Sequence, residues 1–238
     1  MLAASGQRSQ EVTGALVATT TQSAIDREKQ LSAEAAAQAV EDGMTVGLGT
    51  GSTVAYLLEP LAGRGLDLRC VSTSPATAAK AARLGLNVVE FIGPDSPARL
   101  DLAIDGADQV DPSGWLVKGG GGAHTREKAV VAASDRFIVI ASANKIVERL
   151  AAPIPLELAS FGLAATLGRL PARVRDAPLS PDGGVIADYL GEFEDPEELA
   201  CRLSCATGVV EHGLFAPSMV SEVLVGRGDT VERIVPPG

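Results

Sequence analysis

Hydrophobic positions along the chain alternate between two spacings, and their order predicts alternating helices and strands. Residues 26–42 are rich in Ala and Glu and carry Leu31, Ala35 and Ala39 at helical spacing, so we expect a helix that ends at Gly43. Short apolar runs then predict strands at 44–48, 68–71, 87–91, 100–104, 115–118 and 137–141. Between the strands, helical patterns cover residues 53–61, 75–84 and 125–134. This alternation is typical of a mainly parallel α/β sheet.

The pattern changes near residue 151, where prolines become frequent and the alternation stops. Beyond them, an acidic stretch at 194–198 predicts the start of a helix that runs through Cys205. Strands are predicted at 185–190, 209–215, 220–225 and 231–235. We interpret the part that follows residue 151 as a small α+β unit.

Residues 1–25 are polar and rich in Thr, Ser, Gln and Ala, and we expect a disordered or loosely attached arm there. They lack the basic start and the apolar centre of a secretory signal. No uncharged apolar run of about 18 residues occurs, so we expect no membrane span. The odd number of cysteines indicates reduced thiols rather than a disulfide framework. We therefore expect a cytoplasmic protein.

The charge of the 238-residue chain, −10 at pH 7, limits its partners. A general nucleic-acid binder needs a basic face, so we expect no nucleic-acid partner. An anionic small molecule stays possible, because a few placed cations and backbone amides can balance its charge locally. Aromatic residues make up only 3% of the chain, so aliphatic side chains must build the core.

A glycine-rich segment, Gly-Leu-Gly-Thr-Gly-Ser-Thr at 47–53, joins a predicted strand to a predicted helix. Small residues let backbone N–H groups approach an anion, and the helix N-terminus adds partial positive charge. Ser52 stands where the dinucleotide fingerprint needs its third glycine, and no lysine precedes it as in a nucleotide P-loop. The segment therefore fits a compact phosphate monoester better than a nucleotide. A tight strand-to-helix turn is the plain structural alternative.

Asp105 and Asp108 follow an apolar strand at the end where ligands bind in open parallel sheets. Two carboxylates at this spacing can bind sugar hydroxyls or transfer protons. They can equally stabilise a turn at a strand end. The calcium-loop pattern fails, because Ala107 occupies its second ligand position.

Lys118 precedes four consecutive glycines, and Glu127 lies in the first turn of the next predicted helix. A glycine run loses extra backbone entropy on folding, so close approach to a ligand explains it better than a linker. A cation, backbone amides and a carboxylate base are the groups that remove a proton beside a carbonyl and stabilise the oxyanion. Taken singly, Glu127 could be an ordinary helix charge, and His124 fits a turn or a supporting contact better than a base.

Together these segments resemble type A ribose-5-phosphate isomerase. The matching strings are residues 46–53, Asp105-Gly-Ala-Asp108, Lys118-Gly-Gly-Gly, Thr125-Arg-Glu-Lys128 and Ser142-Ala-Asn-Lys145, with residues 208–215 similar to the family's C-terminal segment. The resemblance covers about residues 26–236 in the family's order and spacing. The sequence departs from the family pattern at Gln109, where Glu is common, and at His124, where an apolar residue is frequent.

The resemblance implies a role for each motif. The phosphate end of the substrate would lie on Thr50, Gly51, Ser52 and Thr53, with Lys145 supplying charge. The sugar would contact Asp105, Gly106, Ala107 and Asp108, with Asp105 assisting ring opening. The enediolate would be stabilised by Lys118 and by the amides of Gly119, Gly120 and Gly121. Glu127 would be the base that moves a proton between carbons 1 and 2.

The resemblance also implies a Rossmann-like, mainly parallel domain and a smaller ferredoxin-like α+β domain. On this basis residues 26–150 and about 220–238 would form the catalytic domain, and residues 151–219 the small one. Family members interconvert D-ribose 5-phosphate and D-ribulose 5-phosphate in the pentose phosphate pathway. They use no metal or organic cofactor and are usually homodimers or homotetramers. We therefore expect a sugar phosphate as the small-molecule partner, no cofactor, and self-association.

Two other classes of protein stay open at this point. Related folds serve as sugar-phosphate sensors in transcription regulators, but residues 1–25 are too short and uncharged for a basic helix-turn-helix. Another enzyme on a similar fold, such as an amino-sugar-phosphate deaminase or a CoA transferase, is the second alternative. The intact string from Lys118 to Glu127 favours the isomerase over both.

Overall fold

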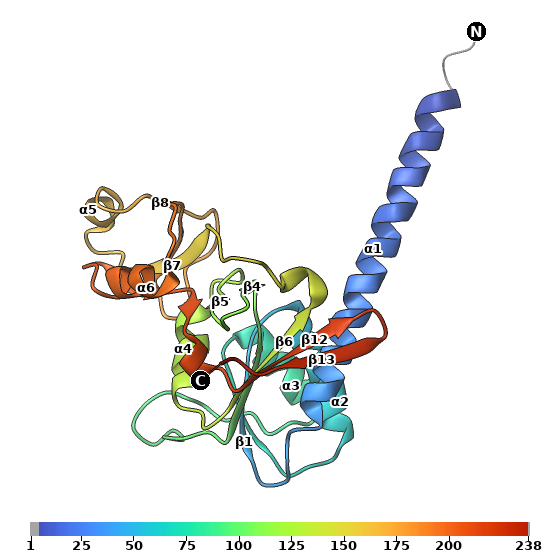
Figure 1. Cartoon of the computed structure of the whole chain (residues 1–238). Helices are drawn as coiled ribbons and strands as arrows, with labels where there is room; N and C mark the ends of the chain where they lie inside the picture. The colour runs from blue at the N-terminus through green and yellow to red at the C-terminus, as the bar shows by residue number, and fades with distance from the viewer. Residues whose placement is uncertain (1–4, 238) are drawn as a thin grey trace.

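A six-stranded, mainly parallel sheet forms the centre of the protein. The computed structural model describes residues 5–237, with side chains described from residue 21 onward. The strands run in the order β13-β12-β6-β3-β1-β2, and only β12 and β13 pair antiparallel (Figure 1). Their bounds are β1 (Thr45–Leu48), β2 (Arg69–Ser72), β3 (Leu102–Gly106), β6 (Phe137–Ser142), β12 (Glu222–Arg227) and β13 (Thr230–Ile234). The mainly parallel α/β sheet predicted from the sequence is confirmed.

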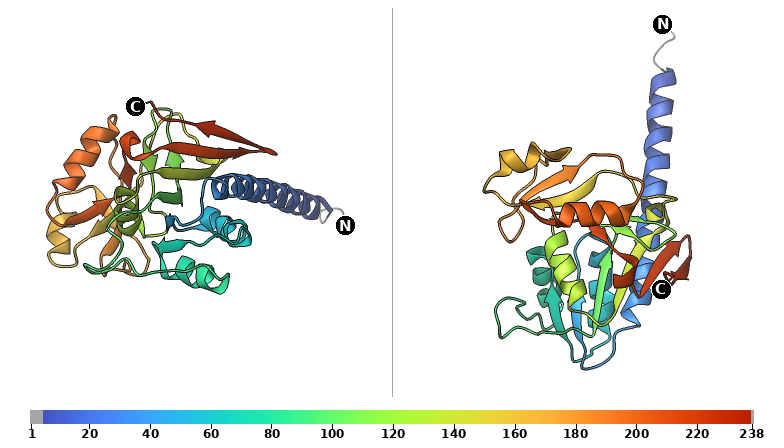
Figure 2. Two further views of the ribbon diagram at one scale, coloured as in Figure 1. Left: turned by 90° about the horizontal axis from the view of Figure 1, so that it is seen from below. Right: turned by 60° about the vertical axis from the view of Figure 1, so that its left-hand side comes forward.

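Helices cover both faces of this sheet. They are α1 (Ser5–Ala37), α2 (Ser52–Gly63), α3 (Pro75–Arg83) and α4 (His124–Ala132), and the last three match the predicted helices (Figure 2). Successive residues of β6 point to opposite faces. Ile138 and Ile140 therefore join the core beneath α1 and α2, while Phe137 and Val139 join the core beneath α4. Burial on both faces explains the unbroken apolar run of this strand.

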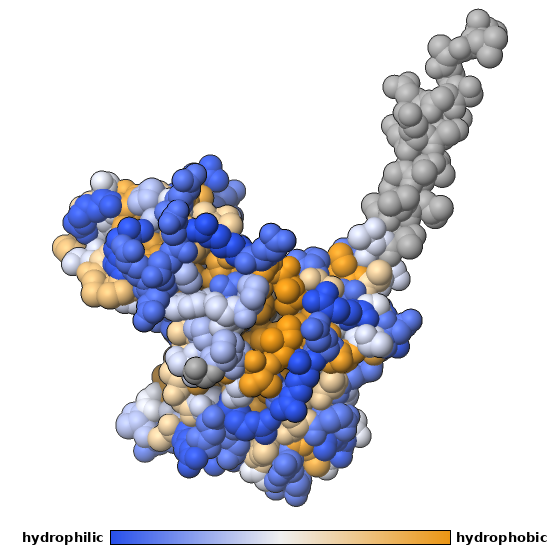
Figure 3. Space-filling view, in the orientation of Figure 1, coloured by the Kyte–Doolittle hydropathy of each residue, from blue (hydrophilic) through white to orange (hydrophobic). Residues whose placement is uncertain are grey.

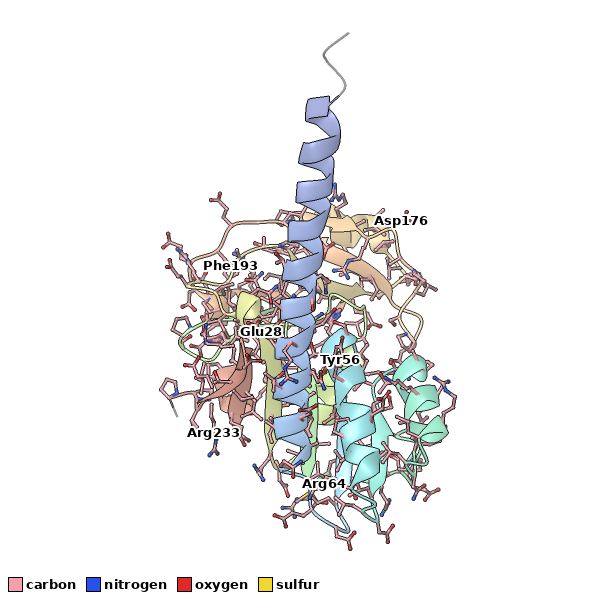
Figure 4. The ribbon with its side chains drawn as sticks, turned by 90° about the vertical axis from the view of Figure 1, so that its right-hand side faces the viewer. Glu28, Tyr56, Arg64, Asp176, Phe193 and Arg233 are labelled. Atoms are coloured by element: carbon pink, nitrogen blue, oxygen red, sulfur yellow. The ribbon has the colours of Figure 1, made fainter. Side chains whose placement is uncertain are left out.

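Helix α1 begins earlier and ends earlier than the sequence predicts. Residues 5–25, expected as a loose arm, form the first part of this helix, and residues 1–4 lie outside the described part of the chain. Glu28 holds α1 to the sheet, because its carboxylate accepts hydrogen bonds from the backbone N–H groups of Ala143 and Gly228, each at 3.0 Å (Figure 4). At the other end, Arg64 donates to the carbonyl oxygens of Ala37 and Val40, which satisfies acceptors that a helix end leaves free.

A four-stranded antiparallel sheet follows in the order β10-β7-β9-β8. It comprises β7 (Ile154–Leu158), β8 (Ala172–Val174), β9 (Val185–Tyr189) and β10 (Val209–His212), with α5 (Leu163–Leu167) and α6 (Pro196–Ser204) beside it. The predicted strand at 185–190 and the predicted helix are confirmed, and Asp195 accepts hydrogen bonds from the N–H groups of Glu197 and Glu198 at the start of α6. Strand β7 escapes the prediction because Pro155 is its second residue.

Short elements connect the two sheets. A three-stranded sheet contains β4 (Gln109–Val110), β5 (Leu116–Val117) and β11 (Leu214–Phe215), and single 3-10 turns follow as η1 (Ala143–Lys145) and η2 (Pro217–Met219). The predicted strand at 209–215 is thus split at Gly213. The predicted strand at 87–91 is wrong. It forms only an isolated bridge between Val88 and Cys70, because the chain turns away after two backbone hydrogen bonds to β2.

Candidate active site

A cavity of about 280 Å³ opens at the carboxyl ends of β1, β3 and β6, the last of which leads into η1. Strand β1 has β2 on one side and β3 on the other, so the chain reverses its direction across the sheet at this point. Ligands of open parallel sheets bind at such a reversal. The volume is near the lower end of the range for small-molecule sites, which run from roughly 300 to 1,000 Å³.

The cavity brings together the residues that the sequence motifs predict, with one exception. Its predicted lining residues are Thr50, Gly51, Ser52, Thr53, Gly106, Ala107, Asp108, Lys118, Gly119, Gly120, Gly121, Glu127 and Lys145. Asp105 does not line the cavity and is buried behind it.

Four further lining residues were not singled out from the sequence: Gln22, Ile25, Lys29 and Asn144. Asn144 belongs to the Ser142–Lys145 string, so the signal for it was present. The other three lie on one face of α1, at helical spacing. Two of them precede residue 26, where the sequence pattern predicts that the helix begins. Their helical spacing therefore could not be recognised from the sequence.

Asp105 is the second-to-last residue of β3, and its carboxylate has three polar partners. Its Oδ1 accepts hydrogen bonds from the N–H groups of Thr50 at 3.1 Å and Gly106 at 2.7 Å. Its Oδ2 lies 2.8 Å from Lys118 Nζ. Gly49 makes room for this carboxylate, because a Cβ at that position would lie 1.9 Å from Asp105 Cγ. The glycine before Thr50 is therefore required by close packing rather than by its φ angle.

Lys118 links two buried carboxylates. Its ammonium nitrogen lies 2.8 Å from Asp105 Oδ2 and 3.2 Å from Glu127 Oε2, and each of these side chains is at most 5% exposed. Burial lowers the pKa of Lys118, but the attraction of Asp105 and Glu127 more than offsets it, so the net pKa is raised above its usual range. The ammonium group therefore stays charged at neutral pH. The Phe215 ring, 5.5 Å from Nζ, covers it on another side.

Glu127 lies in the first turn of α4 and has a strongly perturbed carboxyl group. Burial raises its pKa to about 7, the nearby Asp105 charge adds to the rise, and Lys118 opposes it. Burial also raises the pKa of Asp105, against the opposing effect of Lys118 and the two amides. A carboxylate with a pKa near neutral pH accepts and returns protons readily. Of the two carboxyl groups, Glu127 lines the cavity and Asp105 does not, so Glu127 is the one placed for proton transfer.

One end of the cavity lies at the start of α2. No side chain caps this helix, and the N–H groups of Ser52 and Thr53 donate to no acceptor within the described residues. The amino group of Lys145 likewise has no acidic partner there, while Lys29 pairs with Asp26 at 3.3 Å. Free amides at a helix N-terminus and two lysines suit an anion. The Thr50 hydroxyl is 2.7 Å from that of Thr73.

His124 is fully buried at the start of α4, and within residues 21–237 neither ring nitrogen makes a hydrogen bond of normal geometry. Burial lowers its pKa to about 4, so the ring is neutral at pH 7. It packs against Gly119, where an added Cβ would lie 2.7 Å from His124 Nδ1. His124 therefore supports the glycine run, as the sequence analysis expects.

No cluster of three or more His, Cys, Asp or Glu side chains in the described part of the chain is arranged to hold a metal ion. None of the helices, within the same residues, combines the length and the apolar character that crossing a membrane requires.

Comparison with known proteins gives a consistent match. The family model for ribose 5-phosphate isomerase A (phosphoriboisomerase A) matches residues 69–230. The chain is 44% identical to ribose-5-phosphate isomerase A of Caulobacter vibrioides (strain NA1000 / CB15N) over 228 residues, which cover 89% of this chain and 99% of that protein. It is 45% identical to the Rhodopseudomonas palustris (strain HaA2) protein of the same name, over 86% of this chain and 98% of that one.

The chain belongs to the ribose-5-phosphate isomerase A family.

Solved structures of family members share the whole fold. Ribose 5-phosphate isomerase A from Neisseria gonorrhoeae superposes with a TM-score of 0.85 at 31% identity, covering 90% of this chain and 98% of that one. The Methanocaldococcus jannaschii enzyme gives a TM-score of 0.81 at 31% identity, covering 87% and 97%. Since nearly the full length of each relative is covered, the match includes both the six-stranded and the four-stranded sheet.

The side-chain amide of Gln109 connects two segments of the backbone. Its Nε2 donates to the carbonyl oxygen of Ala151 and its Oε1 accepts from the N–H group of Ala151, each at 2.8 Å. A glutamate can make only the second of these contacts without a proton on its carboxylate. Gln109 thus joins β4 to the segment that leads into β7, outside the cavity.

Proposed function

We propose that this chain is an aldose–ketose isomerase that interconverts D-ribose 5-phosphate and D-ribulose 5-phosphate through an enediolate. The observation that carries the proposal is the buried Glu127 carboxyl, with a pKa of about 7, beside the charged Lys118 in a cavity with an anion-binding end. The names of the relatives agree with it. A D-ribose-5-phosphate isomerase structure at 32% identity, with a TM-score of 0.80, is described as a complex with phospho-erythronic acid, a sugar-acid phosphate.

The phosphate would bind at the start of α2. The amides of Ser52 and Thr53, the hydroxyl groups of the same residues, and the ammonium groups of Lys145 and Lys29 supply donors there. The chain carries a net charge of −10, so these local groups must offset the charge of a phosphate dianion. Lys29 is an addition to the residues predicted from the sequence.

The sugar would lie between the phosphate end and the glycine run. Asp108 lines the cavity, and its Oδ2 accepts a hydrogen bond from the Gly120 N–H at 2.8 Å, which leaves Oδ1 for a sugar hydroxyl. Asp105 reaches the cavity only through Lys118 in this structure. Its assistance to ring opening would therefore pass through the Lys118 ammonium group. This group can donate a hydrogen bond to the ring oxygen while the bond from that oxygen to carbon 1 breaks and the proton of the carbon 1 hydroxyl moves to the ring oxygen.

Proton transfer would use Glu127 and Lys118 together. The Glu127 carboxylate takes the proton from carbon 2 of the open-chain aldose, and the electron pair moves onto the carbonyl oxygen at carbon 1. Lys118 and the backbone amides of the glycine run, apart from that of Gly120, which donates to Asp108, stabilise this negative charge. A proton then passes from oxygen 2 to oxygen 1, and Glu127 returns its proton to carbon 1. The sum is an isomerisation with no net gain or loss of electrons.

A direct assay tests the proposal. Purified chain should convert D-ribose 5-phosphate to D-ribulose 5-phosphate and also catalyse the reverse reaction. Ribose without phosphate and glucosamine 6-phosphate serve as controls for phosphate recognition and for deaminase activity. Ammonia release from glucosamine 6-phosphate, without ketose formation from ribose 5-phosphate, would overturn the proposal.

Assembly and location are proposed from the family alone. We propose a homodimer or homotetramer in the cytoplasm. The face in Figure 3 is mostly hydrophilic and has a hydrophobic area near its centre, which agrees with self-association. Light scattering of the purified chain gives the mass directly. A monomer at micromolar concentration would contradict the assembly.

A further inference from the structure

An arginine next to the four-stranded sheet donates hydrogen bonds to the glycine run. Arg175 directly follows β8, and Asp176, the next residue, is labelled in Figure 4. Its Nη1 donates hydrogen bonds to the carbonyl oxygens of Gly119 at 3.1 Å and Gly120 at 3.0 Å. Its other side pairs with the Asp188 carboxylate on β9 through Nε at 3.1 Å and Nη2 at 2.5 Å. One guanidinium group thus connects β9 to two successive peptide units.

The position of these two carbonyls determines where the amides point. In a trans peptide unit the C=O and the following N–H point in opposite directions. Drawing the carbonyls of Gly119 and Gly120 toward Arg175 therefore turns the N–H groups of Gly120 and Gly121 away from it, toward the cavity that both residues line.

The two N–H groups differ in their hydrogen-bond partners. The Gly120 N–H donates to Asp108 Oδ2 at 2.8 Å. The Gly121 N–H has no acceptor within the described residues. It is therefore the amide of this pair that is free to donate to an oxyanion in the cavity, while the Gly120 amide fixes Asp108.

Arg175 does this without reaching the substrate site. It is absent from the lining of the cavity that contains Lys118 and Glu127, and it lines a neighbouring hollow instead. A planar guanidinium group can pair with a carboxylate on one edge and donate to carbonyls on the other. A lysine has a single nitrogen and cannot keep this spacing between Asp188 and the glycine run.

We propose that Arg175, held by Asp188, is a positioning residue that orients the Gly121 amide toward the enediolate. The inference rests on the proposed isomerase function and adds a residue that no motif of the sequence indicated. Arg175 acts on the charge that develops at carbons 1 and 2 and not on the phosphate. Its loss should weaken stabilisation of the oxyanion and leave phosphate binding intact.

The test compares Arg175→Ala, Arg175→Lys and Asp188→Asn with the wild-type chain. Arg173→Ala is the matched control, because Arg173 lies on β8, is exposed and makes no side-chain hydrogen bond or ion pair within the described residues. Removing one oxyanion donor costs about 10²–10³-fold in kcat, and an indirect loss of its orientation should cost about 10- to 100-fold. We expect this fall in kcat for both Arg175 variants, a smaller fall for Asp188→Asn, and KM within about threefold of wild type, because the phosphate contacts are untouched.

Inhibition by two probes separates positioning from general damage. Phospho-erythronic acid carries a carboxylate at the reacting end, whereas inorganic phosphate reports only on the phosphate end. The Arg175 variants should bind phospho-erythronic acid about tenfold or more weakly and inorganic phosphate as wild type does. Normal phosphate inhibition also shows that the variant is folded. For a variant that does not fold, Arg175→Lys and Asp188→Asn provide the same comparison.

Two results would overturn the inference. One is wild-type kcat and wild-type phospho-erythronic acid inhibition in a folded Arg175→Lys or Asp188→Asn chain. The other is an equal loss of affinity for both inhibitors, which would indicate a structural role only. A wild-type chain without isomerase activity would instead refute the proposed function, so the two failures are distinguishable.

Discussion

Glu127 Oε2 lies 3.2 Å from Lys118 Nζ, and both side chains are almost completely buried. The pair joins a carboxyl group whose pKa is about 7 to an ammonium group whose pKa is raised. At neutral pH the cation is therefore always present, while the carboxyl group exchanges its proton readily. In the proposed reaction, this combination would supply a base and a fixed positive charge within one cavity.

The pKa of Glu127 predicts the pH dependence of the reaction. A base works only when it is deprotonated, so activity should be full above about pH 8 and fall about tenfold per unit well below pH 7. The second ionisation of a sugar phosphate lies near pH 6, which also affects substrate binding. Measuring kcat at saturating substrate separates the two effects. A kcat that stays constant from pH 5.5 to 9 would exclude the perturbed carboxyl group as the base.

Gly49 is predicted to be intolerant of a methyl group. In Gly49→Ala the new Cβ would lie 1.9 Å from Asp105 Cγ, so the carboxylate must move and Lys118 must follow it. Displacement of a catalytic group by about 1 Å can cost roughly 10²-fold in rate, and we expect at least that fall in kcat.

Gly63→Ala is the control for this change, because its added Cβ meets no atom within 4 Å at the end of α2. It should keep full activity and gain about 0.4–1 kcal/mol in the free energy of unfolding. Equal activity of the two variants would show that the position of Asp105 does not matter to turnover.

Lys145 is predicted to contribute to phosphate binding. A charge-assisted hydrogen bond is worth about 1.5–3 kcal/mol, so Lys145→Ala should raise the inhibition constant of inorganic phosphate by roughly 10–150-fold. Lys80→Ala is the control, since Lys80 bonds to the Ala55 carbonyl and pairs with Glu59 away from this cavity. An unchanged constant in Lys145→Ala would remove that residue from the site.

Removal of metal ions should leave turnover intact. The reaction needs a base and a stabilised oxyanion, and Lys118 with the glycine amides can supply the second. Asp105, a possible ligand for a hard cation, is already engaged by Lys118 and two amides. Turnover is measured after exhaustive chelation in metal-free buffer. Loss of activity that one added divalent metal restores would contradict this prediction and the role of Lys118.

The sequence predicts the site well where a motif lies at the end of a parallel strand. The Thr50 and Lys145 segments follow such strands and Asp105 lies at the end of one, and the carboxyl ends of these strands meet at one edge of the sheet. Each motif could therefore be assigned to a common site from local patterns. Only the structure shows that Asp105 is buried behind Lys118, because that depends on how Gly49 packs.

Other features depend on tertiary contacts that leave little local signal. Strand β7 contains Pro155, which argues against a strand in any sequence pattern, yet β9 and β10 pair with it on both sides. Lys29 faces the cavity from a helix that begins earlier than its apolar pattern indicates. Arg175 lies in the proline-rich stretch and meets the glycine run only because the two sheets pack side by side.

The kinetics of Glu127→Gln test the central claim most directly. The substitution keeps the shape of the side chain and removes its basicity, so kcat for ribulose 5-phosphate formation from ribose 5-phosphate should fall by roughly 10²–10⁴-fold. Inhibition by inorganic phosphate should stay at the wild-type level, since the phosphate end of the cavity is unchanged. Near-normal turnover in a folded Glu127→Gln chain would contradict the assignment of Glu127 as the base.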